Sequence, residues 1–381
     1  MEKFQTSSGN KQKILIDCRF VGGGSALGRY AEQLFINLLK LDSNFEFSPI
    51  LLENYKKDIP KIIKKSNPLW TDIKHYSLSE QTKLPKLIRE QNPDLIHYTH
   101  FNVPIFSEKP FVTTILDLTI SRFKDKNQSF VEIMAYNFLL KQVAKRANHL
   151  ITSSKETASD IRKYLKVTQA KTSVVYLGIE EKFKPQSEEK IAAFKKEYKI
   201  DYPYIMYAGQ WRPHKNLLRL FKAFRMLKKN YGTKQKLVLF GKPDSRYPEI
   251  PQTIKALGLE NEIIVLGFIP DDLLPAAYSG ADLYVIPSLA EGFGFPPLEA
   301  MACATPVASS LISCMPEILD EAAVFFDPYD YADMAVKINT ALTNQKLRSV
   351  LIQRGAHLVK KYTWQKTAEN TLRIYQNVLG N

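Results

Sequence analysis

The segment EGFGFPPLEAMACATPV, residues 291–307, constrains this chain more than any other. Two carboxylates, Glu291 and Glu299, enclose two glycines and two prolines, and the apolar run ADLYVIP (281–287) comes just before. Such a run is typical of a buried parallel strand, and the prolines are typical of a first helical turn. Strand, glycine loop and helix in this order present backbone N–H groups to an anion. The segment therefore predicts an α/β fold with an anion site beside two carboxylates.

The identity of the intervening residues adds to this prediction. Carboxylates beside an anion site suit a ligand with both phosphates and hydroxyls, and a nucleotide sugar fits that description. The Glu-x7-Glu pattern, the G-F-G-x-P core and the following L-E-A-M-A resemble the donor site of the family-4 retaining glycosyltransferases. The alternative interpretation is a glycine loop that only turns a strand into a helix, and the structural context distinguishes the two.

Apolar runs alternate with amphipathic stretches, and this pattern predicts parallel sheets with right-handed crossovers. A chain of 381 residues is too long for one ordinary core, and the pattern restarts after a charged stretch at 182–200. The resemblance implies a GT-B fold, in which two doubly wound Rossmann-like domains face each other across a deep cleft. We expect an acceptor-side domain at 1–180, a nucleotide-sugar donor domain at 181–361, and a last helix at 362–381 that crosses back to the first domain.

The net charge of +14 is unevenly distributed. Residues 1–200 hold 33 Lys and Arg against 22 Asp and Glu, whereas residues 201–381 hold 20 against 17. A basic half can meet nucleic acid, anionic lipid or a phosphorylated acceptor, or it can be a solvated surface. No nucleic-acid-binding motif accompanies the charge, so we expect no nucleic-acid partner. The stretch NYKKDIPKIIKK (54–65) suggests peripheral contact with an anionic membrane through an amphipathic helix, or, because Pro60 interrupts it, only the start of a surface helix.

The expected location is the cytoplasm, with the inner face of the cell membrane as a further option. The N-terminal residues MEKFQTSSGNKQK contain no apolar core of a signal peptide, and no apolar run approaches the length of a membrane span. The three cysteines have no CxxC spacing, which fits a reducing compartment and small core residues.

The resemblance extends over nearly the whole chain. GGGSALGRYAEQL (22–34) resembles the family's glycine loop, where Gly28 would let the donor diphosphate approach a helix N-terminus. In YAGQWRPHKNL (207–217), Lys215 matches a lysine that contacts the donor diphosphate. Arg212 is the expected substitute for an arginine that many family members carry where this chain has Gln210. The donor-binding residues implied are Gly28, Gly209, Arg212, Lys215, Glu291, Gly292, Phe293, Gly294, Phe295, Leu298 and Glu299.

The resemblance also implies a chemistry for these residues. Glu299 would accept hydrogen bonds from the ribose hydroxyls, and Glu291 would hold the sugar hydroxyls and favour a cationic sugar. Lys215 and Arg212 would neutralise the leaving diphosphate without a metal or another cofactor. The leaving phosphate itself would take the proton of the acceptor, as inferred for the family's front-face mechanism. We expect at least one of Phe293 and Phe295 to pack beneath the glycine loop.

Several acceptor-side residues permit two interpretations. Asp117 is a catalytic base or the cap of a strand end. His97 and His100 contact acceptor or sugar, or they are ordinary polar residues of the cleft. Many family members have a histidine where this chain has Leu116, whose side chain cannot donate a proton. Asp271 and Asp272 are adjacent, which indicates a helix N-cap better than an Asp-x-Asp metal motif.

The predicted activity is that of a retaining hexosyltransferase with a saccharide or lipid-linked acceptor. GDP-mannose is the favoured donor, because the EGFGFP loop looks like that of bacterial mannosyltransferases; UDP-glucose and dTDP-linked sugars are alternatives. A second hypothesis, prompted by Leu116 and Gln210, is a catalytically weak nucleotide-sugar-binding partner of an active transferase. A third, a sugar-nucleotide epimerase, lacks support because that class has no Glu-x7-Glu loop.

Overall fold

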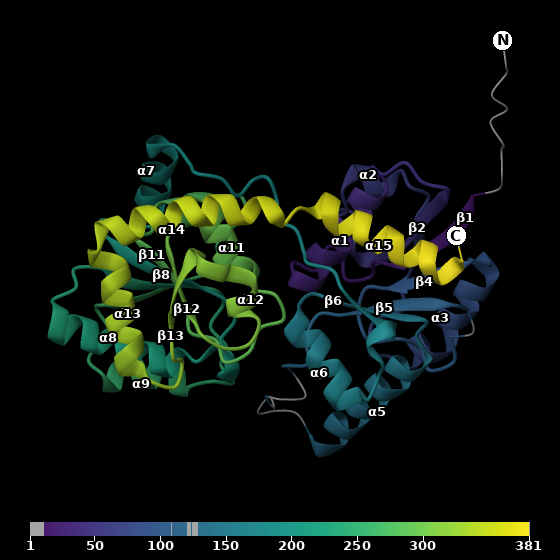
Figure 1. Cartoon of the computed structure of the whole chain (residues 1–381), viewed down its shortest axis with the longest axis horizontal. Coiled ribbons are helices and arrows are strands. Elements are labelled where there is room, and N and C mark those ends of the chain that lie inside the picture. The colour runs from purple at the N-terminus through teal and green to yellow at the C-terminus, as the bar shows by residue number, and fades with distance from the viewer. Residues whose placement is uncertain (1–10, 108, 120–122, 124–128, 381) are drawn as a thin grey trace, which may run out of the picture.

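The chain folds around two parallel β-sheets, each at the centre of one domain (Figure 1). The computed structural model describes residues 11–380 apart from 108, 120–122 and 124–128. The first sheet has the strand order β3-β2-β1-β4-β5-β6-β7 and the second the order β10-β9-β8-β11-β12-β13. In each sheet the order reverses beside the first strand of the domain, and ligands of doubly wound sheets bind at this point.

The strands are short and almost continuously apolar, as expected for strands covered by helices on both faces. The first sheet contains β1 (Gln12–Asp17), β2 (Phe45–Leu52), β3 (Leu69–Thr71), β4 (Leu95–Tyr98), β5 (Phe111–Ile115), β6 (His149–Thr152) and β7 (Thr172–Val174). The second contains β8 (Tyr204–Ala208), β9 (Lys236–Phe240), β10 (Ile263–Gly267), β11 (Leu283–Ile286), β12 (Val307–Ser310) and β13 (Ala323–Phe326).

Serine caps fix where the first domain's helices begin. The side chains of Ser25, Ser77, Ser129 and Ser154 each accept a backbone N–H from the first turn that follows. The helices of this domain are α1 (Ala26–Leu38), α2 (Lys61–Lys64), α3 (Leu78–Gln91), α5 (Phe130–Arg146) and α6 (Lys155–Leu165). Those that follow are α7 (Glu188–Glu197), α8 (Leu217–Tyr231), α9 (Glu249–Ala256), α10 (Leu274–Ser279), α11 (Phe295–Ala302), α12 (Met315–Leu319), α13 (Tyr331–Thr343), α14 (Gln345–Leu358) and α15 (Trp364–Leu379).

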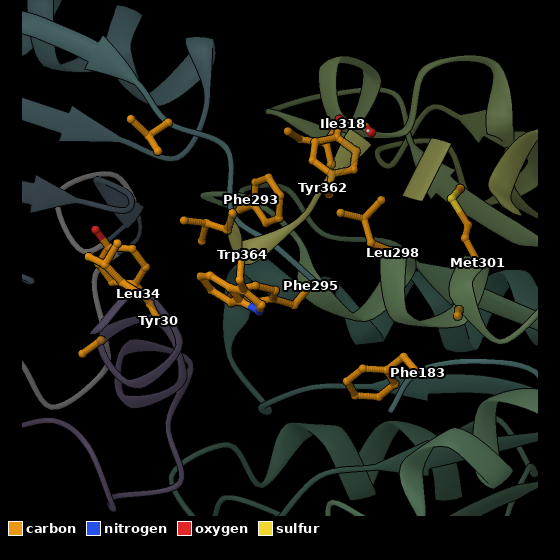
Figure 2. Packing of buried hydrophobic residues seen from close by; sticks show 14 of the residues in the cluster. Tyr30, Leu34, Phe183, Phe293, Phe295, Leu298, Met301, Ile318, Tyr362 and Trp364 are labelled. Carbon is orange, nitrogen blue, oxygen red and sulfur yellow. Dashed lines mark hydrogen bonds between the residues drawn. The ribbon is translucent and has the colours of Figure 1, made fainter. Parts of the chain in front are cut away.

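The last helix, α15, crosses from the second domain and lies along α1 of the first (Figure 1). Its Tyr375 hydroxyl is 2.6 Å from Nδ1 of His97 on β4. Trp364, at the start of α15, lies between Tyr30 of α1 and Phe295 of α11, with ring centroids 6.5 and 6.0 Å away (Figure 2). Apolar packing across the crossing therefore joins the two domains in one continuous cluster.

Two expectations fail in the first domain. The stretch 54–65 contains the end of a 3-10 turn (Glu53–Tyr55) and the four-residue α2, and Ile59 and Ile63 are buried in the core. The prediction of an amphipathic membrane-surface helix is therefore wrong, and the alternative interpretation, the start of a short helix, agrees with the structure. Two of the three isoleucines of this stretch face the core, whereas Ile62 is exposed. His97 is fully buried between Tyr375 and Thr114 and lies outside the cleft, and burial lowers its pKa to about 3.

Within the described part of the chain, no helix combines the length and apolar character that a bilayer crossing needs.

The crossing between domains predicts a strict requirement for Gly178. A Cβ added there would lie 2.1 Å from the backbone nitrogen of Trp364, where no flexible side chain can yield. We expect Gly178→Ala to lower the free energy of unfolding by about 3 kcal/mol or more. Gly23→Ala is the control, because the atom nearest to its Cβ would be the carbonyl oxygen of Phe20, 3.4 Å away. Equal urea midpoints for the two variants would contradict this requirement.

Candidate functional site

A cavity of about 670 Å³ lies between the carboxyl ends of the two sheets, within the size range of small-molecule sites. Both domains line it. The first contributes Gly24, Ser25, Ala26, Leu27, His100, Phe101, Leu116, Asp117, Thr119, Phe123, Tyr136, Ser153 and Leu177. The second contributes Gln210, Arg212, Pro213, His214, Lys215, Tyr247, Ala290, Glu291, Gly292, Phe293, Gly294, Phe295 and Pro296.

A lysine–glutamate ion pair forms the polar centre of this cavity. Lys215 ends a 3-10 turn (Pro213–Lys215) that follows β8, and its Nζ is 2.6 Å from Oε1 of Glu291. The Ser288 hydroxyl donates to the same oxygen at 2.7 Å. Ser313 holds the backbone of Glu291, accepting from its N–H at 3.1 Å and donating to its carbonyl at 3.0 Å. Among the described residues no side chain or amide donates to Oε2, which leaves that oxygen for a ligand hydroxyl.

The charge of Lys215 determines the ionisation of Glu291. Burial alone would raise the pKa of this carboxyl, but the charge and hydrogen bond of Lys215 and the hydroxyl of Ser288 outweigh burial, so the pKa of Glu291 is lowered. Glu291 is therefore anionic at neutral pH, and a cationic sugar beside it would be stabilised.

The glycine loop brings the two domains into backbone contact. A Cβ on Gly292 would lie 2.4 Å from the carbonyl oxygen of Leu116, at the end of β5. The Ser153 hydroxyl is 2.8 Å from that oxygen and 3.0 Å from the carbonyl oxygen of Gly292. This one hydroxyl therefore donates a bifurcated hydrogen bond to a carbonyl of each domain. The carbonyl of Leu116 also accepts from Thr157 at 3.2 Å. Leu116 thus contributes a packing surface for Gly292, and its carbonyl has protein partners.

The start of α11 differs from a simple helix N-terminus. Gly294 has a φ of +88° and precedes the helix without a side-chain cap. Pro296 and Pro297 follow in the first turn and have no N–H to offer an anion. The amides beside the cavity are consequently those of the loop 292–295. Phe293 and Phe295 stack edge-on at 5.5 Å and are at least nine-tenths buried while they still border the cavity.

Four of the expected donor-binding residues do not line the cavity: Gly28, Gly209, Leu298 and Glu299. The N–H of Gly28 is bonded to the Ser25 side chain at 3.0 Å, and glycine is required because a Cβ would lie 2.5 Å from the carbonyl oxygen of Phe20. The cavity is instead bordered here by Gly24, by Ser25 and by the first two residues of α1, Ala26 and Leu27. Leu298 is fully buried in the core.

Gly209 has a packing role as well. It follows β8, and a Cβ at this position would lie 2.8 Å from the Tyr207 hydroxyl. A Cβ on Gly241 would lie 2.2 Å from the carbonyl oxygen of Gly209, so the glycine at 241 lets the neighbouring strand ends meet.

Glu299 lies at the interface between the domains, but it is covered. Its side chain is 4% exposed; Arg29 of α1 donates to Oε1, and the Tyr278 hydroxyl donates to Oε2 at 2.8 Å. Burial raises the pKa of Glu299, and the charge of Arg29 opposes that rise. Neither Arg29 nor Tyr278 was predicted; the sequence gives no signal that connects residues this far apart.

Other cavity residues complete the site. Arg212 lies over the ring of Tyr247 at 6.0 Å, a neighbour that sequence reasoning missed. Asp117 lines the cavity and also accepts a hydrogen bond from the N–H of Thr119 at 2.8 Å. Its position therefore fits both a catalytic base and the cap of a strand end. His100 lines the cavity, and burial lowers its pKa to about 3, which keeps the ring neutral.

The adjacent acidic pair also has another role than expected. Asp271 accepts from Lys182 at 2.5 Å and from Arg29 at 3.2 Å, while α10 starts three residues later without a side-chain cap. The N-cap prediction for Asp271 and Asp272 was therefore wrong. Within residues 11–380, outside the gaps given above, no three His, Cys, Asp or Glu side chains are grouped as metal ligands.

The ion pair in the cavity predicts a pH-dependent stability. Because its folded pKa is below the reference value of 4.5, Glu291 stabilises the fold above that value and loses this contribution as the pH falls through the folded pKa. In Lys215→Met the largest influence that opposes burial is lost, and only the smaller effects of the Ser288 hydroxyl and His214 remain, so Glu291 loses most of this stabilising contribution. We expect a loss of about 2–4 kcal/mol in urea unfolding at pH 7 that shrinks toward pH 4. Lys215→Met with Glu291→Gln is the matched control; a gap from wild type that is the same at every pH would contradict this account.

Comparisons with known proteins agree with this architecture. Residues 188–358 match the family described as "Glycosyl transferases group 1", and residues 47–183 match "Glycosyltransferase Family 4". The chain is 26% identical over 306 residues to the O-antigen chain mannosyltransferase B of Escherichia coli, covering 80% of each protein. It is 29% identical over 255 residues to the O-antigen chain mannosyltransferase RfbU of Salmonella typhimurium, covering 67% of each.

The fold has close counterparts among solved structures. HepE from Anabaena in complex with UDP-glucose superposes with a TM-score of 0.74 at 17% identity, over 95% of this chain and 99% of that one. Two parallel-sheet domains with the cavity between them are the GT-B arrangement. The chain belongs to the family-4 glycosyltransferases and has their GT-B fold.

Proposed function

We propose that this chain is a retaining hexosyltransferase that transfers mannose from GDP-mannose to a saccharide acceptor. The observation that carries the proposal is the Lys215–Glu291 pair in the cavity between the domains, with Oε2 of Glu291 accessible to a ligand. A cation and an anion side by side suit a substrate that separates into a diphosphate and a cationic sugar.

The residues have distinct parts in the transfer. The bond between the anomeric carbon and the diphosphate oxygen breaks, and its electron pair leaves with the diphosphate toward Lys215 and Arg212. Glu291 faces the sugar, where its charge stabilises the cationic carbon. The acceptor oxygen then bonds to the same face of that carbon, and its proton passes to the leaving phosphate oxygen. Two side-chain cations at the cavity support a reaction that needs no metal.

The acceptor side of the cavity suits a saccharide. Phe101 and Tyr136 form an edge-on pair at 4.8 Å, and both line the cavity with Asp117. Aromatic rings offer apolar faces to a sugar, and Asp117 can accept one of its hydroxyls. The bacterial O-antigen mannosyltransferases that this chain resembles support mannose as the sugar, whereas UDP-glucose in the HepE structure keeps a uridine donor as the alternative.

A catalytically weak binding partner is the rival proposal. Gln210 lines the cavity where many family members have an arginine, and Leu116 offers no proton. The intact pair of Glu291 and Lys215 favours the enzyme over this rival.

The donor is tested by binding and turnover of the purified chain. We expect GDP-mannose to raise the melting temperature more than UDP-glucose or dTDP-glucose, because a ligand that binds only the native state stabilises it. Mannose release from GDP-mannose should continue in EDTA and fall about 100-fold or more in Glu291→Gln. Val336→Ser on the surface of α13 is the control. Binding without turnover would favour the weak partner, and loss in EDTA with recovery in Mn²⁺ would overturn the metal-free mechanism.

Peripheral membrane contact is a further part of the proposal, and α5 supports it. Phe130, Val131, Met134 and Phe138 are 71%, 73%, 57% and 56% exposed on one side of this helix. Helical spacing places Lys141 and Lys145, both exposed, on the same side two turns on. Apolar residues followed by cations suit the interface of an anionic bilayer. Because Tyr136 of the same helix lines the cavity, a lipid-linked acceptor would meet the site directly.

Vesicle co-sedimentation tests this surface. We expect the chain to bind phosphatidylglycerol vesicles better than phosphatidylcholine vesicles, and the bound fraction to fall about tenfold in the triple variant Phe130→Ser, Met134→Ser, Phe138→Ser. Val336→Ser should bind as wild type. Equal failure to bind both vesicle types, or unchanged binding of the triple variant, would contradict membrane contact through α5.

A further inference from the structure

Arg29 joins three carboxylates across the domain interface. It extends from α1 of the first domain and donates to Glu299 of α11; its Nε is 3.1 Å from Glu180, and its Nη2 is 3.2 Å from Asp271. The guanidinium also lies 5.8 Å from the ring centroids of both Phe183 and Phe295. A planar fork of five donors between two aromatic rings has a fixed direction, which a lysine cannot reproduce.

The Glu299 carboxylate keeps acceptor capacity in this arrangement. An ionised carboxylate has about four acceptor positions, two on each oxygen. Arg29 uses one position on Oε1 and Tyr278 uses one on Oε2. One position on each oxygen remains, which matches the two adjacent hydroxyls of a ribose. Because Glu299 is 4% exposed and lies outside the cavity, these positions become available to a diol only when the domains move apart at this point.

The charge of Arg29 acts on the ionisation of the same group. Burial raises the pKa of Glu299, and Arg29 is the largest influence in the opposite direction. Asp271, Tyr278, Tyr284 and Cys303, which also act on this carboxyl or feel its charge, are neutral or acidic. The second cation of the cluster, Lys182, pairs with Asp271 at 2.5 Å and with Glu180 at 3.2 Å instead.

We propose that Arg29 is the positioning residue of the donor site, which orients Glu299 from the opposite domain so that it binds the ribose diol. The inference rests on the proposed function, because it needs a nucleotide sugar as ligand. Recognition of the ribose then depends on both domains: the carboxylate belongs to the second domain and the cation that orients it belongs to the first. The ribose site would be complete only after the domains have closed around a nucleotide sugar and Arg29 again contacts Glu299.

The test compares Arg29→Gln and Arg29→Lys with Arg225→Gln, an exposed arginine on α8. Donor hydrolysis is measured against GDP-mannose concentration and pH. For Arg29→Gln we expect a donor KM raised about tenfold or more, with a smaller change in kcat. The acid limb of kcat/KM should move to higher pH, because Glu299 takes up a proton more readily without the cation. Arg29→Lys should retain the wild-type acid limb with an intermediate KM, since it keeps the charge and loses the fork.

The outcomes separate this inference from the proposed function. If wild type neither binds nor hydrolyses any nucleotide sugar, the proposed function fails and the inference fails with it. If wild type is active and Arg29→Gln keeps the wild-type KM and acid limb, Arg29 is not a positioning residue, whatever its melting temperature. A melting temperature lowered with both kinetic readouts unchanged would identify a purely structural ion pair.

Discussion

The backbone contact between Gly292 and Leu116 is the constraint on which the rest of the site depends. No side chain separates the carboxylate loop of the second domain from the end of β5 in the first, and Ser153 bridges the two carbonyl oxygens. This approach places Glu291 and Asp117 along one cavity although they belong to different domains. A larger residue at 292 would move the loop outward and take the lysine–glutamate pair with it, so the composite site requires glycine there.

Glu291 of the glycine loop and Glu299 of α11 illustrate how environment sets ionisation. Both are nearly buried, yet the pKa of Glu291 is lowered and that of Glu299 is raised. Glu291 has a lysine and a serine hydroxyl on one oxygen, which outweigh the cost of burial. At Glu299 burial outweighs the arginine, whose charge is shared with two other carboxylates. The anionic form of Glu291 is therefore stabilised by residues of its own domain, whereas that of Glu299 depends on a cation from the opposite domain.

The sequence predicted what is local. The apolar run before residue 291 is a strand, the glycine loop follows, and the helix starts at its prolines, because each feature depends on neighbouring residues. The contacts of Gly28 could not be foreseen: its glycine is required by a carbonyl eight residues earlier, which only the folded turn reveals. The pairing of Arg29 with Glu299 spans 270 residues and has no sequence pattern. The isoleucines at 59 and 63 suggested an amphipathic surface, yet periodicity alone does not say which side faces the core.

Arg29 and Tyr278 cover Glu299, and this limits how a nucleotide sugar can reach its carboxylate. The cavity ends at Pro296, and the carboxylate beyond it is sealed by Arg29. A ribose can reach Glu299 only if the domains separate there. The chain crosses between domains twice, and the crossings are adjacent: the N–H of Ile179 donates to the carbonyl of Tyr362 at 3.0 Å. Because Arg29 and Glu299 belong to different domains, a separation of the domains here would also separate this ion pair, and their closure would restore it.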